Sequence, residues 1–142
     1  MKYDELNEKQ LRAVCKELTC DTHELESYLD DGDYLLLTDA EADEKAQEYI
    51  KDSLWAFNAS FILSECGLDR SGAESLRTMQ EKSCEGANDF ILSLVEKTCG
   101  LADFVSAAIS ADGRGHFLSF YDGEETEISI PDNDTLYLYR CN

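Results

Sequence analysis

The spacing of apolar residues changes once along this chain of 142 residues, close to Ser110. Before that point apolar side chains recur every three or four residues, which is the period of a helix with one buried face. After it they alternate with polar side chains, which is the period of a β-strand. The sequence therefore predicts an α+β fold, with a mostly helical body of five or six helices and a small C-terminal antiparallel sheet of two or three strands.

The helical part divides into six predicted segments. Thr38 and Glu41 have the spacing of a capping box, and no helix breaker follows them before Gly67. The second half of this long segment is apolar on all sides, so we expect it to form the central rod of the core. Ser71 and Glu74 repeat the capping-box spacing. The predicted helices cover residues 4–18, 22–31, 39–66, 72–83, 87–99 and 101–109.

The C-terminal part has the pattern of a small sheet. Residues 117–121 and 124–130 flank Asp122-Gly123, a pair favoured in hairpin turns. Residues 131–134 form a second predicted turn, and residues 135–140 alternate like a third strand, with Tyr137 and Tyr139 on one face. The chain has one proline and no Gly/Ser-rich tract. We therefore expect a single domain over residues 1–142, with the helical body at 1–110 and the sheet at 111–142.

Charge restricts the partners more than any motif does. The chain has 31 acidic and 12 basic residues, a formal net charge of −19. Direct binding to nucleic acid depends on Lys and Arg at phosphates, and an anionic surface also repels acidic lipid, so neither partner is expected. Residues 1–8 contain no apolar segment typical of a secretory signal, which predicts a cytoplasmic protein. A basic partner protein remains.

No enzyme motif is found. The common phosphate-binding, dinucleotide-binding, zinc-protease and serine-hydrolase motifs are missing, and the acidic loops at 30–33 and 132–134 lack the spacing of a calcium loop. The six cysteines are expected to be free thiols, because the chain is large and its compartment reducing, and the lack of a Cys-x-x-Cys pair argues against a structural zinc site. The sequence predicts no catalytic residue, no cofactor and no metal ion.

An acidic row is predicted on the helix after Thr38. Its members recur at three- and four-residue steps, so they lie on one face at a spacing comparable to that of phosphates along a strand. The alternative is the ordinary solvated face of an amphipathic helix. Trp55, one turn later, could anchor an interface or be buried under a neighbouring helix. The row consists of Glu41, Glu44, Glu48 and Asp52.

A second group of reactive residue types lies where the apolar spacing changes. It contains a candidate general base, carboxylates to orient it and a cation, as an active site would. The alternative is structural: Gly113 and Gly115 let the chain turn, Arg114 offsets nearby carboxylates, and His116 pairs with one of them. The group consists of Asp112, Arg114, His116, Asp122, Glu124 and Glu125.

Five segments resemble those of small acidic proteins of bacteriophages and mobile elements. They are LTDAEAD, LWAFN, DGRGHFL, YDGEE and YxYR, all from Leu37 onward. This resemblance implies a bacteriophage setting and no particular chemistry. By size and charge alone, the chain is also similar to nucleic-acid mimics that block host defences, including anti-restriction and anti-CRISPR proteins.

Together these features predict a non-enzymatic inhibitor that binds a basic, nucleic-acid-binding host protein. The acidic row and the Asp112–Glu125 group are the predicted partner-binding residues. Two alternatives remain open: a small enzyme or ligand-binding protein centred on Asp112, Arg114, His116 and Asp122, and a structural or assembly component of the virion. The sequence leaves the oligomeric state undetermined.

Overall fold

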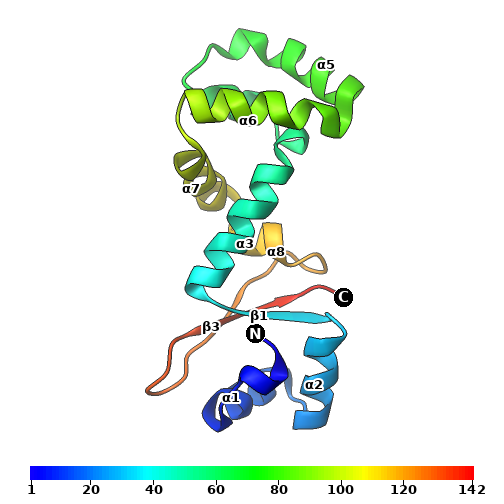
Figure 1. Cartoon of the computed structure of the whole chain (residues 1–142), viewed down its shortest axis with the longest axis vertical. Coiled ribbons are helices and arrows are strands. Elements are labelled where there is room, and N and C mark those ends of the chain that lie inside the picture. The colour runs from blue at the N-terminus through cyan, green and yellow to red at the C-terminus, as the bar shows by residue number, and fades with distance from the viewer. The chain divides into compact units, whose positions relative to one another are not determined.

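The computed structural model describes all 142 residues and confirms the α+β class (Figure 1). It contains eight α-helices, four short 3-10 helices and one three-stranded antiparallel sheet. The α-helices are α1 Glu8–Leu18, α2 Thr22–Asp30, α3 Asp39–Asp52, α4 Ala59–Glu65, α5 Ala73–Ser83, α6 Asn88–Lys97, α7 Leu101–Asp112 and α8 Arg114–Leu118. The strands are β1 Tyr34–Thr38, β2 Thr126–Ile128 and β3 Leu136–Arg140, and the 3-10 helices are η1 Tyr3–Glu5, η2 Leu54–Ala56, η3 Arg70–Gly72 and η4 Cys84–Ala87. None of the helices is both long and apolar enough to cross a membrane.

The chain divides into two compact units. Unit 1 comprises Met1–Ala46 and Asp112–Asn142, and unit 2 comprises Gln47–Ala111. This division differs from the one expected at residue 110, because α1, α2 and β1 belong with the C-terminal strands. Unit 1 carries 21 acidic and seven basic residues, whereas unit 2 carries ten and five. Most of the negative charge therefore belongs to unit 1.

The sheet of unit 1 differs from the predicted one. Its order is β1-β3-β2, with Leu36 and Thr126 both opposite Leu138 on the central strand. The third predicted strand is confirmed as β3, and the turn at 131–134 joins β2 to β3. The predicted strand at 117–121 was wrong, since these residues begin inside α8, and β1 was not predicted at all. The hairpin is therefore β2–β3 and not a pair around Asp122-Gly123.

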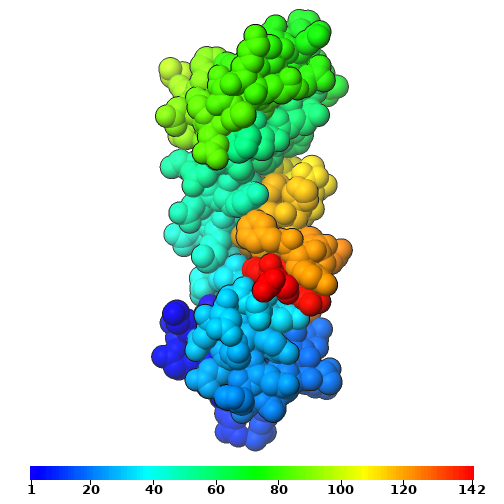
Figure 2. Space-filling model, turned by 90° about the vertical axis from the view of Figure 1, so that its right-hand side faces the viewer, coloured from blue at the N-terminus to red at the C-terminus, as the bar shows by residue number.

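The C-terminal end of β3 is tied to the start of β1. The amides of Cys141 and Asn142 donate to the Asp33 carbonyl at 2.8 and 3.3 Å, and the Tyr121 amide donates to the Arg140 carbonyl at 3.3 Å. Figure 2 shows the last residues, in red, lying against these two segments at the surface of unit 1. These hydrogen bonds satisfy backbone groups at the end of the central strand.

Helices α1 and α2 pack against one face of the sheet. Side chains of both strand faces are buried: Leu136 and Leu138 point to one face, and the fully buried Tyr139 points to the other, as the alternation predicts. The core cluster on the α1 and α2 side consists of Leu6, Val14, Leu25, Leu36, Ile128, Ile130, Leu136 and Leu138.

The long helix predicted at 39–66 was wrong, because it breaks after Asp52. Two side-chain amides in unit 2 satisfy the backbone at the break. Asn88 donates to the Lys51 carbonyl at 2.9 Å and accepts from the Trp55 amide at 3.2 Å, and Gln80 donates to the Phe57 carbonyl at 2.8 Å. The predicted central rod is therefore replaced by η2 and α4.

The core of unit 2 is built around three phenylalanine rings. The ring of Phe104 lies 5.5 Å from the rings of both Phe57 and Phe61, measured between centroids. Phe104 is fully buried, as are Ile91 and Val95 of α6, whereas Phe57 and Phe61 are partly buried. Tilted and edge-on aromatic pairs at this distance add to the free energy of burial.

The two predicted capping boxes had different outcomes. At the start of α3 one half of the predicted box forms, since the Glu41 amide donates to the Thr38 hydroxyl at 3.3 Å; the Glu41 carboxylate accepts from that hydroxyl at 3.1 Å and not from the Thr38 amide. The predicted box at Ser71 does not form. Instead the Ser71 amide donates to the Asp69 carboxylate at 2.8 Å, which begins η3 and delays α5 to Ala73.

Helix α1 is followed by Thr19, whose backbone conformation is energetically unfavourable for a residue other than glycine. Thr19 has φ 52° and ψ 49°, in the left-handed region that favours glycine. We expect Thr19→Gly to raise the free energy of unfolding by about 0.5–1 kcal/mol, measured by urea denaturation. Thr78→Gly inside α5 is the control, and it should lower stability by about 0.5–1 kcal/mol. A Thr19→Gly variant less stable than the wild type would contradict this prediction.

Candidate functional site

Arg114, the first residue of α8, is the centre of an ionic cluster in unit 1. Its side chain is only 10% exposed. The guanidinium Nη1 lies 2.8 Å from Asp39 Oδ1 and 2.9 Å from Asp43 Oδ1, both at the start of α3. Glu125 accepts from Nε at 2.8 Å and from Nη2 at 3.2 Å in a two-point contact. One cation thus serves three carboxylates from two distant parts of the chain.

Aromatic residues of β3 complete this cluster. The guanidinium carbon of Arg114 lies 4.5 Å from the centroid of the Tyr137 ring, and the Tyr139 hydroxyl donates to Glu125 Oε2 at 2.5 Å. Burial alone would lower the pKa of Arg114, but its hydrogen bonds to Glu125, Asp39 and Asp43 raise that pKa overall. Burial raises the pKa of Tyr139, and the hydrogen bond to Glu125 raises it further. The phenol therefore stays protonated and keeps donating.

The other members of the Asp112–Glu125 group are not brought together around Arg114. His116 is exposed on α8, with its ring edge-on to Phe117 at 5.0 Å. Asp122 accepts from the Ser119 hydroxyl at 2.7 Å and from the Glu124 amide at 3.0 Å, which lowers the pKa of Asp122. Asp112 is exposed at the end of α7. No hydrogen bond or ion pair joins Asp112, His116 and Asp122.

Helix α3 carries carboxylates on two opposite sides. The side chains of Ala42, Ala46 and Ile50 are fully buried, and Asp39 and Asp43 on the same side are the two that Arg114 binds. The predicted row occupies the opposite side. Glu44, Glu48 and Asp52 are exposed, and Glu41 lies 3.9 Å from the N-terminal ammonium. The row therefore lies along one solvent-facing side of a continuous helix, as predicted.

Two lysines border this row. By their positions on the helix, Lys45 and Lys51 lie on its two flanks, and both are exposed. Neither lies within 4.0 Å of a carboxylate. The row is thus a strip of negative charge with positive charge at its margins.

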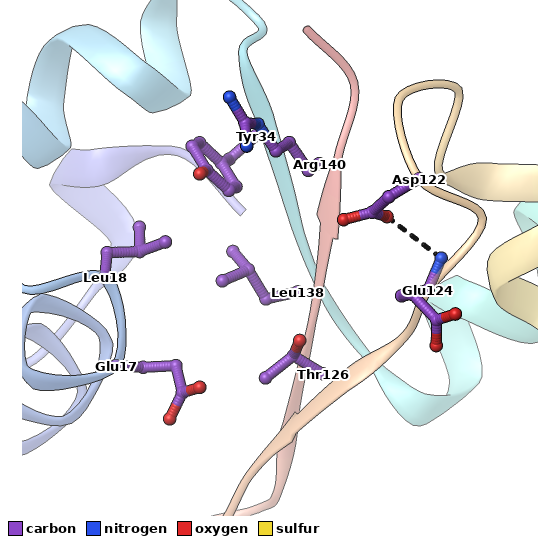
Figure 3. Close-up of a pocket in the computed structure, with 8 residues that line it drawn as sticks. All are labelled: Glu17, Leu18, Tyr34, Asp122, Glu124, Thr126, Leu138 and Arg140. Carbon is purple, nitrogen blue, oxygen red and sulfur yellow. Dashed lines mark hydrogen bonds between the residues drawn. The ribbon is translucent and has the colours of Figure 1, made fainter.

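Unit 1 also has a cavity that sequence reasoning missed. It has a volume of about 190 Å³, and Figure 3 shows carboxylates from α1 and from the loop before β2 around it. Asp122 and Glu124 were predicted site residues, but Glu17, Tyr34 and Arg140 come from three other elements, so no local pattern could have indicated them. The lining residues are Glu17, Leu18, Tyr34, Asp122, Glu124, Thr126, Leu138 and Arg140.

A second, more open cavity of about 470 Å³ lies in unit 2. Trp55, whose role the sequence left open between an interface anchor and a core residue, is partly buried and lines it. Phe57, Arg77 and the buried Gln80 line the same cavity. Trp55 is therefore neither fully in the core nor fully at the surface.

No group of three or more His, Cys, Asp and Glu side chains is arranged to hold a metal ion. Comparisons of the chain with protein-family models, with curated proteins and with solved structures gave no match.

Proposed function

We propose that this protein is a non-enzymatic inhibitor that presents the acidic row of α3 to a basic, nucleic-acid-binding protein. In the bacteriophage setting that the resemblance of five segments implies, the partner would belong to a host defence system. The row occupies positions that phosphates of a nucleic-acid strand would take in the partner's groove.

The observation that supports this proposal is that the carboxylates on the two sides of α3 differ in their partners. Asp39 and Asp43 are neutralised by Arg114 within the protein, whereas Glu44, Glu48 and Asp52 face solvent with no cation within 4.0 Å. Because all members of the row lie on one helix, its geometry fixes their spacing, at a rise of about 1.5 Å per residue.

The charge of the whole chain supports the same function. Only six of the 31 carboxylates lie within 4.0 Å of a cation, and three of those share Arg114. Repulsion among so many uncompensated charges lowers the stability of the fold. A long-range negative field, in turn, accelerates association with a basic protein, at low salt above all.

The test compares two triple variants with the same net charge. Glu44→Gln, Glu48→Gln and Asp52→Asn remove the row, while Glu81→Gln, Glu85→Gln and Glu96→Gln remove three exposed carboxylates of unit 2 elsewhere. Basic proteins captured from host lysate would be purified and their affinity measured at several salt concentrations. We expect the row variant to bind about tenfold more weakly, from about 0.5 kcal/mol per lost contact, and to show a smaller salt dependence.

The control triple variant should bind nearly as the wild type does. Duplex DNA should compete with the wild type for the captured protein, because both would occupy the same groove. Equal affinities for the two triple variants would refute the role of the row. Recovery of no basic partner at low or high salt would refute the function itself.

A further inference from the structure

The C-terminal end of α1 brings two cysteine residues close together. Thr19 adopts the left-handed conformation, its amide donates to the Lys16 carbonyl at 3.3 Å, and the Cys20 amide donates to the Cys15 carbonyl at 3.0 Å. This pair of hydrogen bonds defines a Schellman motif, in which the first and last residues place their side chains against each other. Here both of those residues are cysteines.

Both side chains are partly buried against the core cluster of unit 1, and the neighbouring Cys15 raises the pKa of the Cys20 thiol. A disulfide requires Cα atoms about 4.4–6.8 Å apart, and one compact turn of backbone joins these two. The hydrogen bond from the Cys20 amide to the Cys15 carbonyl holds the two residues within this one turn.

We propose that Cys15 and Cys20 form an oxidation site, at which a small-molecule disulfide converts the two thiols into an intramolecular disulfide. The bond would lock the Schellman turn. It would thereby hold Thr19 in its strained conformation and fix the last turn of α1, whose Glu17 and Leu18 line the cavity of unit 1.

The reaction is an ordinary thiol–disulfide exchange with oxidised glutathione as the oxidant. One cysteine thiolate attacks a glutathione sulfur, forms a mixed disulfide and releases one glutathione thiolate. The second cysteine thiolate then attacks the protein sulfur of that mixed disulfide and releases the second. Two electrons pass to the oxidant, and each cysteine loses its proton to solvent.

Exchange here should be slow at neutral pH. Burial raises the pKa of Cys20 to about 11, and the neighbouring Cys15 adds to this shift. Since only the thiolate reacts, the rate should rise as the pH increases. The oxidation is therefore best run at about pH 8.5, where the attacking thiolate is more abundant.

Tryptic mass spectrometry of the full-length protein gives a clear readout. Lys16 lies between the two cysteines, so trypsin releases residues 13–16 and residues 17–45 as separate peptides. After oxidation and blocking of the remaining thiols, we expect these peptides to be joined, with a mass lower by two hydrogens than their sum. The joined pair should be absent from Cys15→Ser and Cys20→Ser.

Two controls test whether the reaction is specific to these two cysteines and whether it depends on the folded structure. Cys84→Ser removes an exposed cysteine elsewhere and should leave the joined peptides unchanged. The exchange with oxidised glutathione is also brought to equilibrium in denaturing urea. The effective concentration of the two thiols there should be at least about tenfold lower than in the folded protein. Full alkylation of both Cys15 and Cys20 in the oxidised folded protein would overturn the proposal. Equal effective concentrations in urea and in buffer would also overturn it.

Discussion

Replacing Gly115 with alanine is expected to lower the free energy of unfolding by about 3 kcal/mol or more. A Cβ at this position would lie 2.5 Å from the Gly123 carbonyl oxygen, 2.6 Å from the Glu124 carbonyl carbon and 2.8 Å from the Glu125 amide nitrogen. All three atoms belong to the backbone, so a side-chain rotation cannot relieve the clash. The loop that carries Glu125 would have to move, and its two-point contact with Arg114 would be lost.

The measurement is urea denaturation followed by far-ultraviolet circular dichroism. Amide hydrogen exchange of β1 and β3 would show whether the loss is in unit 1. Gly86→Ala is the control, because its nearest neighbour would be the Ser83 Cβ at 3.8 Å, an ordinary contact. That variant should stay within about 0.5 kcal/mol of the wild type. A loss below about 1 kcal/mol in Gly115→Ala would show that the close approach is not rigid.

The second large effect is expected from Arg114→Met, which keeps most of the apolar stem but removes the charge. Three carboxylates would then face one another without their cation, and the contact with the Tyr137 ring would weaken. Removing one partner of a buried pair costs about 3–5 kcal/mol. Because Asp39 and Asp43 are 68% and 63% exposed and stay hydrated, we expect a smaller loss of about 2–3 kcal/mol.

Two further variants sharpen this prediction. Arg114→Lys keeps the charge without the forked geometry and should lose less than Arg114→Met. Arg12→Met removes an exposed arginine, with a side chain 78% exposed that pairs with Glu8, and should change stability by less than about 0.5 kcal/mol. Equal losses in Arg114→Met and Arg12→Met would mean that the cluster does not anchor unit 1.

Local patterns predicted the elements whose hydrogen bonds and buried faces lie within one segment. Helices α1, α2, α5, α6 and α7 fall inside the predicted ranges or within a few residues of them, because a 3.6-residue apolar period suffices to define them. The predicted start of the first helix at residue 4 is occupied by η1, and α1 begins only after its Asn7 cap. Such differences at helix ends reflect caps that periodicity does not register.

The errors lie where distant residues compete with local preference. Asp122-Gly123 favours a hairpin turn, yet Gly115 packs against this turn and the Asp122 carboxylate binds Ser119, which holds the chain in α8 and a loop. No element is predicted for the four apolar residues before Thr38, since a run so short fits a strand or a helix equally well. They form β1 because β3 offers them an edge about 100 residues later in the chain.

The acidic row and the Arg114 cluster differ in the same way. The row could be predicted, since four residues at helical spacing need only the helix that carries them. The alternative that Arg114 offsets carboxylates is confirmed by its ion pairs. Its partners Asp39 and Asp43 lie 75 and 71 residues earlier in the chain, so no sequence spacing could identify them. The cavity of unit 1, lined from five segments, was beyond prediction for that reason too.

The sequence alone determined the α+β class, most of the helices, the negative surface and the side of α3 that faces solvent, because each depends on composition or on residues within a few turns of one another. That α3 ends at Asp52, that β1 joins the sheet and that Arg114 neutralises the inner carboxylates of α3 became visible only in the folded chain. Those outcomes depend on hydrogen bonds and ion pairs between residues far apart in the sequence. The free energy of such contacts is not reflected in the local spacing of apolar residues.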